Sequence, residues 1–200
     1  SQTAGHEHVL FHNHIGNGFR YRYPLIQYKL HNHRPALYCL DEGIEEVVAF
    51  FRKQPRSLSL NGVPYYPEVE TLRIHEHTCV TNELQHQYQL NNWLALNSEN
   101  FKKYNRLKTE EERQSLLEGI LAGNIKSFGK TVDWWIEDNI EIKWQGDIRI
   151  RQTHFKGKRM PTFSVRFSSN VDLPHRIGLG KGVSIGYGTL IKRKNAVNEH

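Results

Sequence analysis

Apolar and polar positions alternate along the first eighty residues in a way that predicts strands on both sides of one helix. Aromatic residues alternate with arginines at the start of residues 19–30, and a second strand is expected over 36–40 after a turn. Apolar positions then recur at helical spacing from 44 to 51 until Pro55 ends the helix, and two or three further strands are expected over 57–80. The order strand, strand, helix, strand is most of a ferredoxin-like unit.

The second part of the chain partly repeats this order. A strand is expected over 87–96, and a helix is expected to start at Thr109, which can form a capping box with Glu112. Alternation returns over 140–152 and 162–167, and a last short strand follows a glycine-rich stretch.

These patterns predict an α+β fold made of two tandem ferredoxin-like (RRM-like) units. The predicted N-terminal unit spans residues 1–83 and the C-terminal unit spans 84–200, without a low-complexity linker between them. The first strand and helix of the N-terminal unit have no counterpart in the sequence and would precede Ser1. Two packed units with a short connection predict one rigid body with a groove on one face.

Residues 177–190 read IGLGKGVSIGYGTL and hold five of the fifteen glycines within eleven residues. Glycine this dense loses much backbone entropy on ordering, and the usual compensation is a positive φ angle or a close approach to phosphate. The stretch lacks the Gly-Lys-Ser/Thr of a nucleotide P-loop and the spacing and helix of a dinucleotide fingerprint. It therefore favours a polymeric phosphate ligand, and the alternative is a tight corner that closes the second sheet.

Positive charge gathers in the same part of the chain. Residues 148–198 hold eleven lysines and arginines and one acid, Asp172, whereas residues 1–147 hold sixteen bases and nineteen acids. The whole chain has a formal net charge of +6. A basic half beside a nearly balanced half is typical of nucleic-acid binding, and a basic solvated face is the alternative.

Composition narrows the class of protein further. With 200 residues and 38% hydrophobic residues, the chain suits one ordinary domain or two small ones. No apolar run approaches the roughly 18 residues of a membrane span and no signal peptide is visible, so we expect a cytoplasmic protein without a membrane partner. Cys39 and Cys79 lack the spacing of a metal site and are expected to be reduced, buried thiols.

Two motifs together carry a family resemblance. The first is a segment near the N-terminus that reads FHNH over 11–14 and YRYPLIQYK over 21–29, and the second is the glycine-rich stretch. In this order they resemble the CRISPR-associated endoribonucleases that cut repeat RNA into guide RNAs, the sixth Cas family, and within it the subtype-b branch. The resemblance covers nearly the whole chain and departs from the family at the absent first strand and helix.

The resemblance implies a metal-independent endoribonuclease that uses no cofactor. In the family, a ribose 2′-OH attacks the adjacent phosphate and leaves a 2′,3′-cyclic phosphate. Imidazole suits both proton transfers because its pKa lies near neutrality, and a lysine suits the extra charge of the phosphorane. The family places its catalytic histidine before the tyrosine-rich strand, which implies His14 first and His12 second, with Lys29 as the charge stabiliser.

The resemblance also implies CRISPR repeat RNA, as a stem-loop or unstructured, as the binding partner. Subunits of a CRISPR effector complex and a second copy of the chain are further partners that the family allows. The glycine-rich stretch is expected to present N–H groups to phosphates, while basic side chains hold an RNA stem by its backbone. The expected contact residues are Gly178, Gly180, Lys181, Gly182, Gly186, Gly188, Arg149, Arg151, Lys156, Lys158, Arg159 and Arg176.

Three alternatives stay open. The twelve histidines include His-x-His pairs at 6/8, 31/33 and 75/77 as well as 12/14, so the pair at 12/14 can arise by chance, and such pairs also suit zinc. A catalytically inactive RNA-binding subunit of an effector complex would share the glycines and the basic half. A generic nucleic-acid-binding module would bind any RNA in a salt-sensitive way without cutting it.

Overall fold

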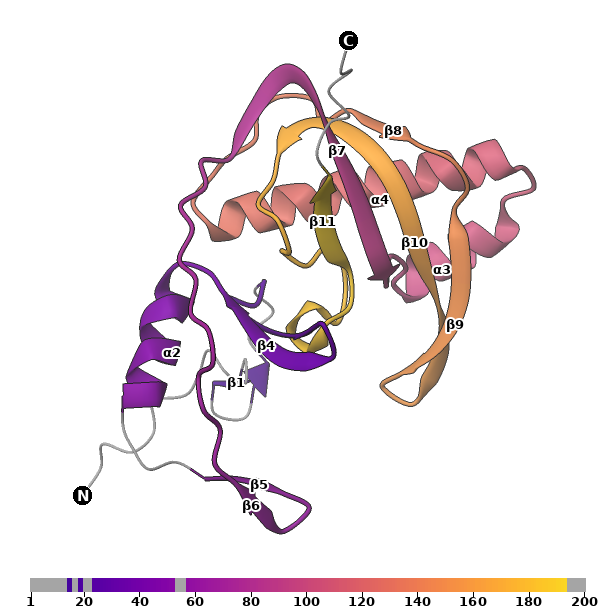
Figure 1. The fold of residues 1–200 in the computed structure, drawn as a ribbon. Helices are drawn as coiled ribbons and strands as arrows, with labels where there is room; N and C mark the ends of the chain where they lie inside the picture. The colour runs from indigo at the N-terminus through magenta and orange to yellow at the C-terminus, as the bar shows by residue number, and fades with distance from the viewer. Residues whose placement is uncertain (1–13, 16–17, 20–22, 53–56, 194–200) are drawn as a thin grey trace.

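A five-stranded antiparallel sheet in the second part of the chain carries most of the core (Figure 1). The computed structural model describes residues 14–15, 18–19, 23–52 and 57–193. In chain order the elements of this part are β7 (Val80–Trp93), α3 (Ser98–Arg106), α4 (Glu110–Thr131), β8 (Ile142–Trp144), β9 (Arg149–Phe155), β10 (Lys158–Asp172), the 3-10 turn η1 (Val183–Ile185) and β11 (Thr189–Arg193).

The strand order confirms the predicted α+β fold of ferredoxin-like type. The sheet runs β11–β7–β10–β8, and β9 also pairs with β10, with every pairing antiparallel. A ferredoxin-like unit follows the sequence β-α-β-β-α-β, and here β8 and β9 share the place of its second strand. Residues 173–188, which we call the crossover, connect β10 to β11 where such a unit has its second helix.

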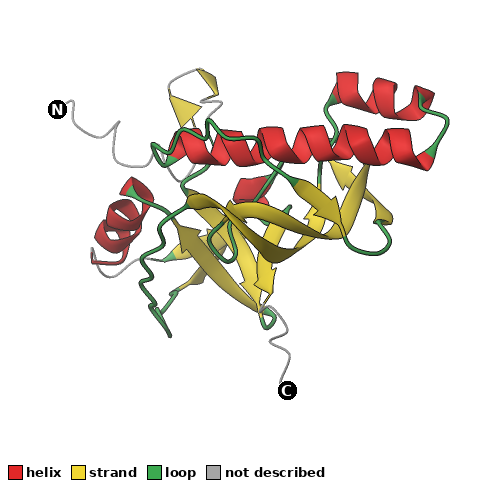
Figure 2. Ribbon diagram, turned by 90° about the horizontal axis from the view of Figure 1, so that it is seen from above, coloured by secondary structure: helices red, strands yellow, loops and turns green. Residues whose placement is uncertain are grey.

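The helices cover one face of this sheet (Figure 2). Helix α4 buries Leu117, Leu121, Ile125 and Phe128, which recur every three or four residues and join one hydrophobic cluster with β7 and β10. The predicted capping box is confirmed, because the Thr109 hydroxyl accepts from the Glu112 N–H at 3.2 Å while the Glu112 carboxylate accepts from the Thr109 N–H at 3.1 Å.

The first part of the chain has less regular structure. Its elements are β1 (His14–Ile15), β2 (Gly18–Phe19), β3 (Ile26–His31), β4 (Arg34–Cys39), α2 (Glu42–Arg52), β5 (Leu58–Leu60) and β6 (Val63–Tyr65). Strand β3 pairs with β4, and α2 follows as the sequence predicts. The strand expected over 19–30 is interrupted, since its second piece starts at Ile26, after Pro24.

The sequence predicts two or three strands over 57–80, and two strands form there. Only the short hairpin β5–β6 forms there, around the left-handed turn of Asn61 and Gly62, and β7 starts at Val80. Residues 66–79, which we call the strap, form neither helix nor strand and run from β6 past β4 to β7 (Figure 1). Pro64 and Pro67 lack the N–H that a longer ladder needs, which favours this outcome.

Both cysteines are free thiols, but they are half-buried rather than fully buried. Burial raises the pKa of each thiol to about 11, so both stay protonated at neutral pH. Of the helices in the described ranges, none is long and apolar enough to cross a bilayer.

Candidate nucleic-acid interface

The glycines of the crossover are required by its backbone. Gly188 has a φ of 62°, and a Cβ atom there would lie 1.9 Å from the Leu179 carbonyl oxygen. Gly180 has a φ of 91°, and a Cβ atom there would lie 2.6 Å from the Trp93 ring. These two positions therefore support the tight-corner interpretation, because no larger residue fits without moving the core.

The hydrogen bonds of the crossover divide its N–H groups into two sets. Those of Lys181 and Gly188 donate to the carbonyl oxygens of Leu94 at 3.2 Å and Asn92 at 3.1 Å, which ties the crossover to the end of β7. The N–H groups of Gly180 and Gly182 donate to no backbone carbonyl within the described segments. The N–H groups of this second set are therefore available for a phosphate.

The first part of the chain packs directly on the crossover. The Tyr23 hydroxyl donates to the Gly178 carbonyl oxygen at 2.8 Å and accepts from the Gln27 amide at 2.9 Å. Burial raises the pKa of Tyr23, so its phenol stays protonated and keeps donating. The predicted charge stabiliser, Lys29, lies on β3, as Gln27 does, and its ammonium donates to the Thr189 hydroxyl at 3.3 Å.

Lys29 is unusually buried for a lysine, and its pKa is unusually low. Its side chain is 8% exposed, and burial, with a smaller effect from the positive charge of Arg176, lowers its pKa to about 8. Charging this amine costs solvation free energy that a nearby anion would recover. The end of the crossover therefore presents a cation that a bound anion would stabilise.

The hairpin of β9 and β10 reaches the other end of the crossover. The Thr153 and Tyr187 hydroxyls lie 3.0 Å apart, and the Phe155 ring packs against the Tyr187 ring with 5.7 Å between centroids. Burial and the charge of Lys156 at the hairpin tip lower the pKa of Lys181 in the crossover. Two regions predicted separately to bind RNA are thus brought together.

A polar cleft of about 360 Å³ lies between this hairpin and the crossover. The predicted residues Arg151 and Gly186 both line it. The other lining residues are Asn92, Gln152, Thr153, Thr162, Ile185 and Tyr187. A groove of this kind, with an arginine and several hydroxyl and amide groups, suits a sugar–phosphate backbone.

The remaining predicted residues lie away from the polar cleft or outside the residues that the structure describes. Arg149, Lys158 and Arg159 are exposed on the hairpin and line neither described cavity. His14 starts β1, where its backbone pairs with Phe19, and His12 lies outside the described residues.

Sequence patterns missed several residues of this region. Tyr187, Thr153 and Thr189 give no signal, because isolated hydroxyl residues in strands and loops are common. Asn92 could be suspected only from its φ of 49°, which no sequence pattern reveals. The structure also brings His31, His75 and His175 near one another, although the sequence marks the first two only as members of His-x-His pairs.

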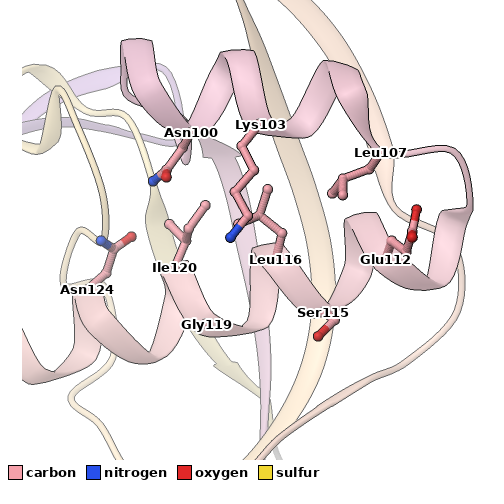
Figure 3. A pocket seen from close by; sticks show the side chains of 9 residues that line it. All are labelled: Asn100, Lys103, Leu107, Glu112, Ser115, Leu116, Gly119, Ile120 and Asn124. Atoms are coloured by element: carbon pink, nitrogen blue, oxygen red, sulfur yellow. The ribbon is translucent and has the colours of Figure 1, made fainter.

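A larger cavity of about 750 Å³ lies between α3 and α4 (Figure 3). Its lining residues are Asn100, Lys103, Leu107, Glu112, Ser115, Leu116, Gly119, Ile120 and Asn124. One cation and one anion among them give no preference for phosphate, and no predicted site residue takes part. At its inner end Asn124 accepts a hydrogen bond of 3.0 Å from the Trp93 indole.

Among the residues that the structure describes, no group of three or more His, Cys, Asp and Glu side chains is arranged to hold a metal ion.

Two family models together match almost the whole chain. The model of the Cas6b N-terminal domain matches residues 2–80, and that of the Cas6b C-terminal domain matches residues 80–193. The chain belongs to the Cas6b family. The resemblance found in the sequence is thereby confirmed, while the division at residues 83 and 84 stays a prediction.

Solved structures agree with this membership. A crystal structure of Cas6b superposes with a TM-score of 0.81 at 29% identity and covers 92% of this chain and 84% of its own. A crystal structure of the CRISPR RNA processing endoribonuclease Cas6b superposes with a TM-score of 0.69 at 28% identity. The match covers 86% of this chain and 83% of that one. An uncharacterized protein of Methanocaldococcus jannaschii is 29% identical over 145 residues, 68% of this chain and 92% of that protein.

Proposed function

We propose that this Cas6b family member is an endoribonuclease that cleaves CRISPR repeat RNA. Its similarity to a solved CRISPR RNA processing endoribonuclease over 86% of the chain supports this activity. The observation that carries the proposal is the nearly buried Lys29, held at the end of the glycine-rich crossover with a pKa lowered to about 8. A buried amine of this kind is stabilised most by an anion that forms next to it.

The proposed chemistry is attack of a ribose 2′-OH on the adjacent phosphate, which forms the new P–O bond while the bond to the 5′-oxygen breaks. One histidine removes the 2′-OH proton and another group returns a proton to the leaving 5′-oxygen. His14 and His12 are the proposed proton-transfer groups, and Lys29 stabilises the phosphorane. The products are a 2′,3′-cyclic phosphate and a 5′-OH, and no metal or cofactor takes part.

RNA binding is proposed to use both sides of the polar cleft. Arg151 and the hairpin-tip residues Lys156, Lys158 and Arg159 contact phosphates of an RNA stem, together with Arg149 on the same hairpin. Gly180 and Gly182 offer free N–H groups, Lys181 adds charge, and Arg176 lies near Lys29. Gly178, Gly186 and Gly188 hold the shape that makes these contacts possible. The protein is proposed to act in the cytoplasm, and effector subunits or a second copy are partners to be tested by co-purification.

The first test is incubation of the whole chain with repeat RNA in EDTA. A substrate with a single 2′-deoxy nucleotide at the cut site serves as control. A single cut that persists in EDTA and disappears with the deoxy substrate supports the proposal. Tight binding without a cut identifies an inactive RNA-binding subunit, and equal weak binding to any RNA identifies a generic module.

Variants then test the proposed roles. Replacement of Lys29 by Met is expected to lower the single-turnover cleavage rate by roughly a hundredfold or more, because a preorganised donor to the transition state is lost. Binding of the deoxy substrate should change much less. Lys102→Met, on the exposed face of α3, is the matched control and should cut at the wild-type rate. His12→Ala and His14→Ala are compared in the same assay, and wild-type rates in both would remove the histidines from the mechanism.

A further inference from the structure

Four basic or protonatable side chains from three separate segments gather at the start of the crossover, where Arg176 acts on Lys29. His31 ends β3, His75 lies in the strap, and His175 and Arg176 form the turn that opens the crossover. Burial and the positive charges of Arg176, His31 and His75 all lower the pKa of His175. None of the ion pairs within the described ranges includes Arg176.

Asp172 is the acidic residue closest in sequence to the turn at 175–176, and its carboxylate already faces other basic side chains. Asp172 accepts from the Lys192 ammonium, and its carboxylate oxygens lie 3.6 Å from His77 and 4.0 Å from His86. The turn at 175–176 therefore gathers positive charge without a carboxylate of its own to balance it. Such an arrangement is stabilised by an anion supplied from outside.

The hydrogen bonds of His175 leave two donors without an acceptor. The Lys192 N–H points at Nδ1 of His175 at 3.2 Å, and the Arg176 Nε–H points at Nε2 of the same ring at 3.1 Å. A neutral imidazole has only one acceptor nitrogen, so these two bonds exclude each other. In either tautomer the ring N–H and one of these two N–H groups are left over, and an anionic oxygen beside the ring would accept from them.

Arg176 also holds a backbone conformation that its side chain disfavours. Its φ is 73°, in the left-handed region, and its N–H donates to the Leu190 carbonyl oxygen at 2.7 Å. Glycine would adopt this conformation without cost, and this crossover uses glycine at several positions. A strained arginine where glycine would be easier indicates that the guanidinium itself is needed.

We infer that Arg176 and His175, with His31 and His75 beside them, form a phosphate-binding site that holds an RNA linkage next to the one proposed to react at Lys29. This inference rests on the proposed function. Arg176 provides paired N–H donors to the phosphate oxygens, and His175 adds a third donor through Nε2 when Lys192 occupies Nδ1. The site positions the strand and takes no part in proton transfer.

The test is a double-mutant cycle between the protein and the RNA backbone. A series of repeat RNAs, each with one neutral methylphosphonate linkage near the cut site and a 2′-deoxy block, is bound to wild type and to Arg176→Gln. One linkage should raise the wild-type Kd by roughly tenfold and leave the Arg176→Gln Kd unchanged. Arg176→Gln should also reduce the slope of log K against log salt by about 1. Arg106→Gln, on exposed α3, is the matched control and should bind as wild type.

A second variant separates positioning from folding. Arg176→Gly removes the backbone strain, so it should keep or raise the unfolding temperature while it weakens RNA binding as Arg176→Gln does. A fall in unfolding temperature would make Arg176 a structural residue and overturn the inference. The inference would also be overturned if wild type cleaved and bound the RNA but every methylphosphonate linkage changed the Kd of wild type and of Arg176→Gln by the same factor. Absence of both binding and cleavage in wild type would instead overturn the proposed function.

Discussion

The Tyr23 hydroxyl donates a hydrogen bond of 2.8 Å to the Gly178 carbonyl oxygen, 155 residues further along the chain. The Tyr23 ring packs edge-on against Phe128 of α4 with 5.5 Å between centroids. This residue thus joins β3, the crossover and α4. Because Lys29 lies six residues further along the same segment, the contact also sets where its ammonium meets Thr189.

Replacement of Tyr23 by Phe should lower the free energy of unfolding by about 1–3 kcal/mol. The ring still packs on Phe128, but the Gly178 carbonyl and the Gln27 amide lose a buried partner. Urea denaturation of the whole chain measures the change. Tyr65→Phe is the control, since Tyr65 is 51% exposed, and it should stay within about 0.5 kcal/mol of wild type. Equal effects in both variants would contradict the assigned role.

Two glycine substitutions separate backbone conformation from close packing. Gly188 and Gly157 both have positive φ angles, of 62° and 74°, but a Cβ at Gly157 meets no atom within 4 Å. Gly157→Ala should therefore cost only about 1–2 kcal/mol of unfolding free energy, for the left-handed conformation. Gly188→Ala should cost about 4 kcal/mol or more, because the Leu179 carbonyl has to move. Thermal unfolding measures both variants, and equal falls in their unfolding temperatures would contradict this prediction.

Elements with local signals could be predicted from the sequence. The capping box of Thr109 and Glu112 involves atoms only three residues apart, and the turn at Lys156 and Gly157 is set by neighbours in the chain. The position of the crossover was visible for the same reason, since its glycines lie close together.

Contacts between distant segments could not be predicted in this way. Hydrophobic period and residue spacing tell which face of a strand is buried, but not which segment docks on it. His31, His75 and His175 come together only because the strap and β3 both pass the start of the crossover. Lys29 was identified through the family resemblance, whereas its burial follows from β3 lying on the crossover.

Replacement of Lys29 by Met should change stability in a pH-dependent way. The pKa of Lys29 is lowered from 10.5 to about 8 in the folded protein, so between these values the unfolded chain binds more protons. The free energy of unfolding of the wild type therefore rises between pH 8 and pH 10.5. Below pH 8 Lys29 is charged in both states, and the folded protein bears the full cost of burying the charge. The Met variant should be more stable than wild type at pH 7 by up to about 3 kcal/mol, and the gap should close by pH 10.5. Chemical denaturation at the two pH values measures it, and a gap of equal size at both would refute the lowered pKa.

Replacement of Asp172 by Asn should destabilise the junction between the strap and the sheet. The carboxylate is 20% exposed and faces Lys192, His77 and His86, so its loss leaves a partly buried ammonium without its counter-charge. We expect the free energy of unfolding to fall by about 1–3 kcal/mol. Glu141→Gln is the matched control, because its pair with Lys143, at 3.5 Å, is mostly exposed and contributes less than about 1 kcal/mol. Amide hydrogen exchange should rise at the start of β7, in residues 80–86 of the Asp172 variant alone, since this strand end pairs with Asp172. Exchange that rises equally in both variants would mean that Asp172 does not hold this junction in place.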